Sequence, residues 1–288
     1  MNILVTGANG QLGTELQKIA ATDKIHNWYF TDIDTLDITS RTQIEHFFTN
    51  KNIEVCINCA AYTAVDKAEE EPEKALLINA EAPEILAHAC YKNDAFLVHI
   101  STDYVFDGEN YKPYIEENPV CPKSAYAFSK AKGEENVIKK ANRYVIMRTS
   151  WLYAASGNNF VKTMTRLAKE RGEINVVSDQ IGTPTWAFDL AVAIMYVIDK
   201  FGKENIREIF HFSNEGVASW YDFAKAIIEI QQLDCKINPI ESKDFPTPTK
   251  RPFYSVLNKT KFKQFTGITI PYWRDSLEKC LNELNKQQ

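Results

Sequence analysis

Short apolar runs alternate with longer amphipathic segments through the first half of the chain. The apolar runs predict strands near residues 2–6, 28–32, 54–59, 96–101 and 144–148. Helical spacing of apolar positions lies near residues 11–21, 40–50, 73–92 and 124–141. Strands that alternate with helices predict a doubly wound parallel sheet, because each right-handed crossover places its helix on a face of that sheet. We therefore expect an α/β fold with a Rossmann-like domain over residues 1–150.

After about residue 150 the pattern loosens. It predicts helices near 157–171, 186–200, 219–231 and 273–285, and short strands near 174–177 and 208–212. We expect residues 151–288 to form mainly a smaller α/β domain that binds the substrate, with residues 180–205 returning to the first domain. Segment 244–252 is rich in proline and threonine, which predicts an irregular loop because proline cannot donate to a sheet.

Composition narrows the class of protein. The 288 residues are 44% hydrophobic and 25% charged, as in ordinary soluble domains. With no apolar run near the roughly 18 residues of a membrane span, and no secretory signal at the start, we expect a cytoplasmic protein without membrane contact. The net charge of −5 argues against nucleic acid as a partner. Cys56 and Cys59 lie in a predicted buried strand, so we interpret them as packing residues and predict no metal site.

A glycine-rich turn follows the first predicted strand. Gly7, Gly10 and Gly13 are spaced three apart, with Gln11 and Leu12 between the last two. Glycine in this place permits positive φ and close approach of a diphosphate to a helix N-terminus. The turn therefore predicts a dinucleotide site, the alternative being an ordinary glycine turn.

Other residues beyond strand ends extend this predicted site. Asp32 ends the second strand, where a carboxylate accepts from an adenosine ribose and repels a 2′-phosphate, which favours NADH over NADPH. Aspartate also serves turns, so that alternative stays open. Asp37 and Ile38 are candidates to flank the adenine, with a helix cap as the alternative for Asp37. The small residues after the third strand leave room for the middle of the cofactor: Ala60, Ala61, Tyr62 and Thr63.

A second group of polar residues suits carbonyl chemistry. Tyr126 and Lys130 are four apart in a predicted helix and so share one face. A nearby ammonium brings a phenol towards the pKa that general acid catalysis needs. Thr102, at the end of the next strand, offers a second hydroxyl for the same oxygen, and Ile100 and Ser101 before it are candidate cofactor contacts. A simple strand-end cap is the alternative for Ser101 or Thr102.

These motifs resemble the extended short-chain dehydrogenase/reductases and, within them, the dTDP-4-dehydrorhamnose reductase family. The resemblance spans the chain, in GANGQLG at 7–13, TAVDKAE at 63–69, STDYVFDG at 101–108, YAFSK at 126–130, RTSWLY at 148–153, GNNF at 157–160, DQIGTPT at 179–185 and RP at 251–252. It implies reduction of the C4 ketone of dTDP-4-dehydro-β-L-rhamnose to dTDP-β-L-rhamnose by NADH or NADPH. It also implies a nucleotide-sugar substrate and a monomer or homodimer.

The resemblance assigns roles to residues of this chain. Tyr126 would protonate the C4 oxygen, Lys130 would hold the cofactor ribose, and Thr102 would fix the carbonyl. The expected substrate contacts are Val65, Thr102, Asp103, Tyr104, Tyr126, Trp151 as an apolar wall, and Arg251 on the diphosphate. Tyr104 and Trp151 as core aromatics, and Arg251 as a solvated side chain, remain the alternatives.

Some members of this family are magnesium-linked dimers. Glu15 and Glu283 match two of the acidic positions involved, but Phe188 takes the third, with Asp189 one residue further along. One residue turns a helical side chain by about 100°. We therefore expect neither that metal site nor that dimer.

Two other functions compete with reduction. A nucleotide-sugar reductase or epimerase of different specificity would share the fold, whereas a dehydratase would need an acid where this chain has Tyr104. A non-catalytic regulator similar to the β subunit of methionine adenosyltransferase is the second rival. The presence of Thr102, Tyr126 and Lys130 together favours catalysis.

Overall fold

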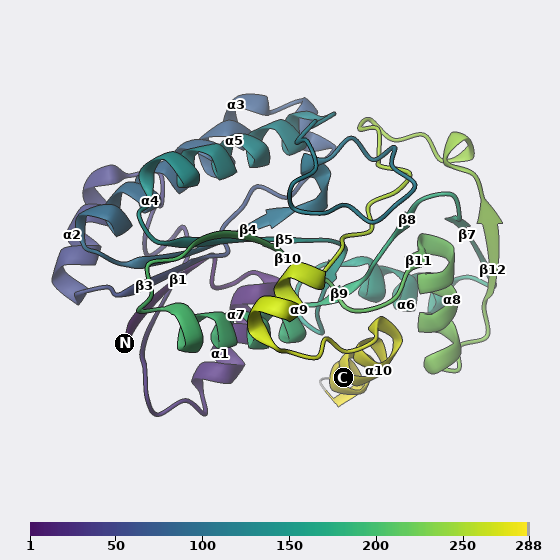
Figure 1. Ribbon diagram of the computed structural model, residues 1–288. Coiled ribbons are helices and arrows are strands. Elements are labelled where there is room, and N and C mark those ends of the chain that lie inside the picture. The colour runs from purple at the N-terminus through teal and green to yellow at the C-terminus, as the bar shows by residue number, and fades with distance from the viewer. Residues whose placement is uncertain (287–288) are drawn as a thin grey trace.

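A computed structural model describes residues 1–286, and a parallel sheet lies at its centre (Figure 1). Among the described residues six strands pair in the order β10-β5-β4-β3-β1-β2. Their bounds are β1 Asn2–Thr6, β2 Asn27–Thr31, β3 Val55–Asn58, β4 Phe96–Thr102, β5 Tyr144–Thr149 and β10 Arg207–His211. All five pairings are parallel. The predicted α/β fold with a doubly wound sheet is confirmed.

The strand order reverses beside β1. From β1 the chain moves outward to β2, then crosses back to β3 on the other side of β1. The crevice above such a reversal is where ligands bind in sheets of this kind, at the carboxyl ends of the strands. The loops after Thr6 and Asn58 therefore face each other across the expected ligand site.

Helices cover both faces of the sheet (Figure 1). One face carries α1 (Gln11–Ala20) and α7 (Ala187–Phe201), which pack together. The opposite face carries α2 (Arg41–Lys51), α4 (Ala82–Lys92) and α5 (Ala125–Lys140). Strands buried on both faces explain why the sequence shows continuous apolar runs rather than alternation.

The helix predicted near residues 73–92 is not a continuous α-helix. It consists of α3 (Pro72–Leu76), a π-helical turn η2 (Leu77–Glu81) and α4. Pro83 lacks the N–H that would donate to the carbonyl of Asn79. That carbonyl packs against α5 instead, where a Cβ on Gly133 would lie only 2.1 Å from it. The wider turn thus lets α5 approach closely.

The second half of the chain builds a separate hydrophobic cluster. Three helices, α6 (Phe160–Glu170), α8 (Trp220–Ile230) and α10 (Trp273–Lys286), surround it, with β7 (Glu173–Val177) paired to β12 (Lys236–Ile240). Two short ladders also lie within this half, namely β6 (Leu152–Tyr153) with β9 (Thr185–Trp186) and β8 (Ile181–Gly182) with β11 (Ala218–Ser219). Short 3-10 turns lie at Lys67–Glu69 (η1), Asp103–Val105 (η3) and Ser242–Asp244 (η4).

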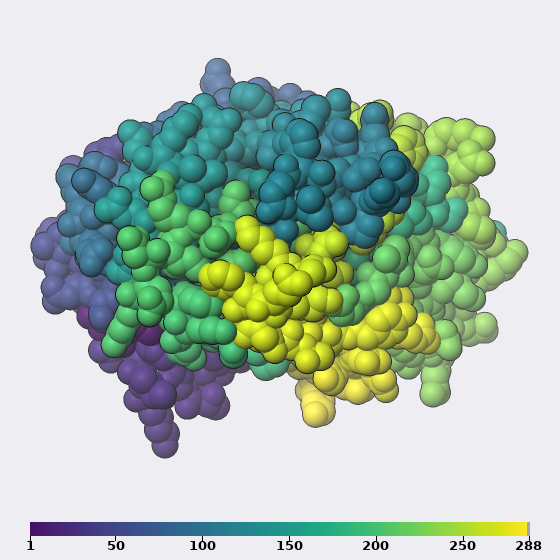
Figure 2. All heavy atoms as spheres, in the orientation of Figure 1, coloured from purple at the N-terminus to yellow at the C-terminus, as the bar shows by residue number. Residues whose placement is uncertain are grey.

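Residues late in the chain complete the layers around the large sheet. Helix α7 is one of these late elements. Strand β10 is another and pairs with β5, and α9 (Thr260–Thr266) packs beside β10. Figure 2 shows the yellow C-terminal residues at the centre of one face, between the green residues near 200 and the blue-teal residues near 110–125. The domain boundary near residue 150 stays a prediction. None of the helices within residues 1–286 is long and apolar enough to cross a membrane.

Candidate active site

The glycine turn has no room for side chains. Gly7 has φ +65°, and a Cβ on it would lie 2.7 Å from the backbone nitrogen and Cα of Ala60. A Cβ on Gly13 would lie 2.5 Å from the carbonyl oxygens of Gly7 and Ala8. Helix α1 starts at Gln11, and Gly10 offers its first N–H groups no side-chain cap. This close backbone and uncapped helix end fit a dinucleotide diphosphate.

Asp32 lies beside this turn. Its Oδ2 accepts from the backbone N–H of Asn9 at 2.9 Å, and its Oδ1 accepts from that of Ile33 at 2.8 Å. The carboxylate thereby joins the end of β2 to the glycine turn. Asp37 Oδ1 accepts from the N–H of Thr39, while Ile38 is buried in the core. The expected ribose contact, the adenine contacts and the NADH preference stay predictions.

The loop after β3 is held by an asparagine that the sequence analysis missed. Asn79, buried in η2, accepts from the N–H of Tyr62 at 2.8 Å and donates to its carbonyl at 3.0 Å. It also donates to the hydroxyl of Ser129 on α5. Ala60 and Ala61 are partly buried in this loop, and Thr63 is exposed. A buried polar residue in an apolar helix was the signal that could have found Asn79.

Strand β4 and helix α5 bring the two candidate hydroxyls together. Thr102 ends β4, and Tyr126 lies in the first turn of α5, which Ser124 caps by accepting from the N–H of Ala127 at 3.1 Å. The Thr102 hydroxyl lies close enough to that of Tyr126 to lower the pKa of the phenol. Both side chains are largely buried. Two hydroxyl groups from residues 24 apart in sequence are thus brought to the same edge of the sheet.

Burial sets the ionisation of the tyrosine and lysine. It raises the pKa of Tyr126, an effect that the Thr102 hydroxyl opposes. The phenol is therefore held in the protonated form that a general acid needs. Burial also lowers the pKa of Lys130 to about 8, with Glu134 acting in the opposite direction. The Lys130 ammonium donates to the carbonyl of Ile100 at 2.7 Å.

A buried ion pair fixes the ends of β4 and β5 under these residues. Arg148 donates to both carboxylate oxygens of Glu134, at 2.7 to 3.2 Å. Ser101 donates to the same carboxylate at 2.5 Å, so its side chain points into this network. Removal of one partner of such a pair would leave a buried charge without its counter-ion, which is strongly destabilising. The sequence analysis did not find this pair.

Asp103 follows Thr102 and is fully enclosed. Its Oδ1 accepts from the Thr102 hydroxyl at 2.9 Å, whereas its Oδ2 has no hydrogen-bond partner within the described residues. Burial raises the pKa of Asp103 to about 6, and the nearby hydroxyls of Ser255 and Thr102 act in the opposite direction. The carboxyl group lies behind the threonine, where its protonation state acts on the Thr102 hydroxyl.

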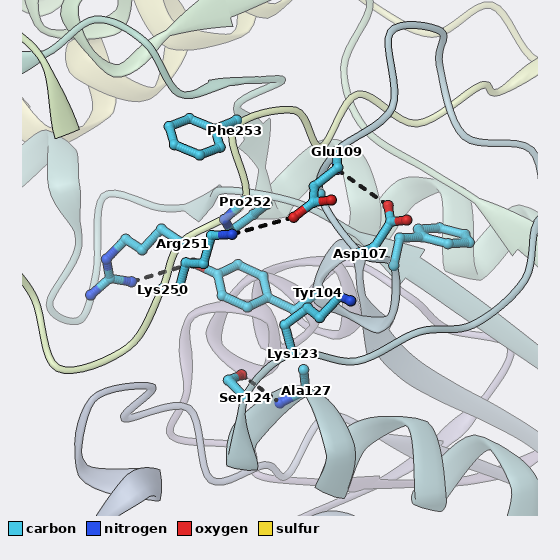
Figure 3. A pocket seen from close by; sticks show the side chains of 12 residues that line it. Tyr104, Asp107, Glu109, Lys123, Ser124, Ala127, Lys250, Arg251, Pro252 and Phe253 are labelled. Atoms are coloured by element: carbon cyan, nitrogen blue, oxygen red, sulfur yellow. Dashed lines mark hydrogen bonds and ion pairs between the residues drawn. The ribbon is translucent and has the colours of Figure 1, made fainter. Parts of the chain in front are cut away.

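Arg251 joins the proline-rich loop to the other wall of the site. Its guanidinium pairs with Asp66 at 2.7 Å and donates to the hydroxyl of Tyr104 at 3.3 Å. Thr249 in the same loop donates to the carbonyl of Val65. Figure 3 shows the cleft beside Tyr104, with Lys250 reaching Glu109 and Phe253 at its rim. Asp66 was missed, although it stands inside the singled-out segment 63–69.

Tyr104 and Trp151 each pack against another aromatic ring. The ring of Tyr104 meets that of Tyr126 edge to face, with centroids 5.6 Å apart. Trp151 follows β5 with φ +46° and stacks on Trp220 at 3.6 Å. Both aromatic residues are partly buried rather than enclosed in the core. Their contact with a sugar stays a prediction.

The acidic positions considered for magnesium contact side chains of the same chain. The Lys18 ammonium lies between the carboxylates of Glu15 and Glu283. Asp189 accepts from Asn214 and Ser276, and Phe188 packs against Trp186. Within residues 1–286 no group of three or more histidine, cysteine or acidic side chains is arranged to hold a metal ion.

The doubly wound sheet, the glycine turn at its switch point and the paired hydroxyls at the end of β4 define a Rossmann-type protein of the short-chain dehydrogenase/reductase class. The sequence model described as RmlD substrate binding domain matches residues 1–286. The chain therefore belongs to this family.

Relatives cover the whole chain. A dTDP-4-dehydrorhamnose reductase of Escherichia coli (strain K12) is 38% identical, over 99% of this chain and 98% of that protein. A crystal structure of a dTDP-4-dehydrorhamnose reductase from Clostridium acetobutylicum superposes with a TM-score of 0.95 at 46% identity, covering 99% and 100% of the two chains. The Bacillus anthracis enzyme in complex with NADP gives 0.92 at 40% identity, covering 98% and 99%.

Proposed function

We propose that the protein reduces the C4 ketone of dTDP-4-dehydro-β-L-rhamnose to the alcohol of dTDP-β-L-rhamnose, with NADH or NADPH as reductant. The observation that carries this proposal is that Thr102, at the end of β4, and Tyr126, in the first turn of α5, lie close together at the ligand edge of the sheet. Full-length similarity to proteins named dTDP-4-dehydrorhamnose reductase supports the substrate. The NADP complex of the similar Bacillus anthracis protein supports the cofactor class.

The residues of the dinucleotide end would hold the cofactor. Gly7, Gly10 and Gly13 would face the diphosphate, and Asp32 would lie at the adenosine ribose. Lys130 would donate to the second ribose, since its ammonium stands between α5 and β4. The bound nicotinamide supplies a hydride to C4 of the sugar.

Two donors would act on the C4 oxygen. Thr102 would donate a hydrogen bond that stabilises the negative charge developing there. Tyr126 would transfer its proton to the same oxygen as the hydride arrives, leaving an alcohol and a phenolate. Because burial keeps Tyr126 protonated, the proton is present before reduction begins.

The sugar and its diphosphate would lie between Tyr104, Trp151 and Arg251. Arg251 already pairs with Asp66, so a diphosphate would share or replace that partner. The loop 249–252 would then close on the nucleotide sugar through the same guanidinium. Val65 and Asp103 complete the expected contacts.

The test is an assay with the purified chain and a dTDP-4-keto-6-deoxy sugar prepared in situ. Loss of NADH or NADPH absorbance with formation of dTDP-rhamnose is the expected result. A UDP analogue serves as the control for the nucleotide. No oxidation of either cofactor with the dTDP substrate would overturn the proposal and favour a non-catalytic regulator.

A further inference from the structure

The backbone of Trp151 is in a conformation that large side chains avoid. Its φ of +46° lies in the left-handed region, which is uncommon for a bulky residue other than glycine. Backbone strain of this kind persists where surrounding contacts determine the conformation, and strained residues are common at functional sites. The carbonyl of Trp151 accepts from the N–H of Thr185 at 3.1 Å, which fixes the peptide group that follows.

Two further residues fix the indole ring itself. The Trp220 ring stacks on it, with centroids 3.6 Å apart and an angle of 8° between the planes. Gly182 leaves space for it, because a Cβ there would lie 2.6 Å from Cε2 and 2.8 Å from Nε1 of Trp151. The glycine belongs to the DQIGTPT motif, and the space it leaves for the indole explains one residue of that motif.

The two contacts are themselves held in register by secondary structure. In the β8–β11 ladder, Gly182 lies opposite Ala218, two residues before Trp220. Ser219 then caps α8 by accepting from the N–H of Asp222, whose carboxylate accepts from Ser219 in return. This reciprocal cap places Trp220 at the first position of α8. Its ring is therefore set by the ladder and by the helix start.

We propose that Gly182 and Trp220, here called the indole bracket, preform the wall against which the sugar packs. Trp220 is a positioning residue, since it acts on the sugar through Trp151. This inference rests on the proposed function, in which Trp151 contacts the sugar. Both stacked rings remain partly exposed, so burial in the core does not by itself explain their contact.

The bracket has a kinetic consequence. Without it the Trp151 side chain would lose its fixed position, and the substrate would have to order it again on binding, which weakens affinity. Trp220→Leu is therefore expected to raise KM for the ketosugar about ten-fold, the scale of one truncated aromatic contact. The values of kcat and of KM for NADPH stay near those of the wild type. Trp220→Phe retains a ring and restores most of the affinity.

A second variant and a control separate positioning from stability. Gly182→Ala pushes the indole from the other side and should raise the same KM, even if Trp220→Leu folds poorly. Trp28→Leu is the matched control, because Trp28 also stacks on an aromatic ring. Its partner is Phe30 on β2, with ring centroids 5.5 Å apart. It should lower the melting temperature without changing KM for the ketosugar. Circular dichroism should show an exciton signal of the stacked indoles that Trp220→Phe removes.

The outcomes distinguish this inference from the proposed function. If the wild type does not reduce the ketosugar, the proposed function fails. If the wild type is active and neither Trp220→Leu nor Gly182→Ala raises KM for the ketosugar, the bracket has no such role. The inference would also be overturned if Trp220→Leu and Gly182→Ala lost kcat, affinity for the ketosugar and affinity for NADPH equally, and by no more than Trp28→Leu does.

Discussion

The two ends of the candidate active site are held by different kinds of contact. At the dinucleotide end, backbone meets backbone, as where Gly7 lies against Ala60. At the sugar end, side chain meets side chain, as where Arg251 pairs with Asp66 and Trp151 stacks on Trp220. The first kind depends on missing side chains, and the second on residues far apart in sequence. Variants should therefore affect the two ends separately.

The largest effect is expected at the residue between the two ends. Tyr126→Phe removes the proton donor and should lower kcat by about 10²-fold or more, the scale of one general acid. Dinucleotide binding, followed by fluorescence titration, should stay unchanged. Tyr91→Phe, an exposed tyrosine on α4, is the control and should keep full activity. Full activity in Tyr126→Phe would refute its assignment as the acid.

Gly7→Ala should separate the dinucleotide end from the sugar end. The new methyl group would collide with Ala60 at a positive φ. Strain of about 1–3 kcal/mol corresponds to about five- to 150-fold weaker dinucleotide binding. Gly172→Ala is the control, since a Cβ there meets no atom within 4 Å. Unchanged dinucleotide affinity in Gly7→Ala would mean that the turn tolerates a side chain.

Arg251→Ala should affect the sugar end alone. The side chains of Arg251 and Asp66 are 27% and 38% exposed, so solvent weakens their ion pair. We expect KM for the nucleotide sugar to rise about three- to ten-fold. In a double-mutant cycle with Asp66→Ala, the two residues should show a coupling free energy of unfolding of at most about 1 kcal/mol. The more exposed pair Lys250–Glu109 is the control and should show little coupling. An equal rise in KM for NADPH would contradict the separation of the ends.

Asp103 should affect stability rather than either end of the site, and the effect should be seen in the pH dependence of unfolding. Burial raises its pKa from 3.8 to about 6, so the folded protein binds this proton more tightly than the unfolded chain. Stability from this group is full below pH 3.8 and is lost as pH rises towards 6. The slope is at most about 1.4 kcal/mol per pH unit. In urea unfolding, Asp103→Asn should lose this part of the slope, and an unchanged slope would contradict the buried carboxyl.

Sequence reasoning was strongest where one segment determines its own structure. The first five strands and the helices around them were confirmed, because apolar runs of strand length alternate with helical spacing. The glycine spacing also placed the turn between β1 and α1 correctly. Thr102 and Tyr126 do lie together, because β4 and α5 both end or begin at the ligand edge.

The sequence could not predict contacts between distant segments. Strand β12 was missed because Lys236–Ile240 mixes polar residues with a proline and needs β7 as its partner. Helix α9 is only seven residues long, too short for a clear periodicity. Asp66 and Arg251 are 185 residues apart, and nothing local marks either as the partner of the other. Trp220 likewise depends on the β8–β11 ladder, in addition to the local cap of α8, for its position.

Strand β10 has a consequence for the synthesis of the protein. It forms the edge of the large sheet beside β5, although about sixty residues of chain separate the two strands. As the chain leaves the ribosome, β5 would wait with an open edge, which is a site for wrong pairing with other chains. A fragment truncated at residue 150 would keep that edge permanently. We therefore expect such a fragment to aggregate, even though it carries the whole glycine turn.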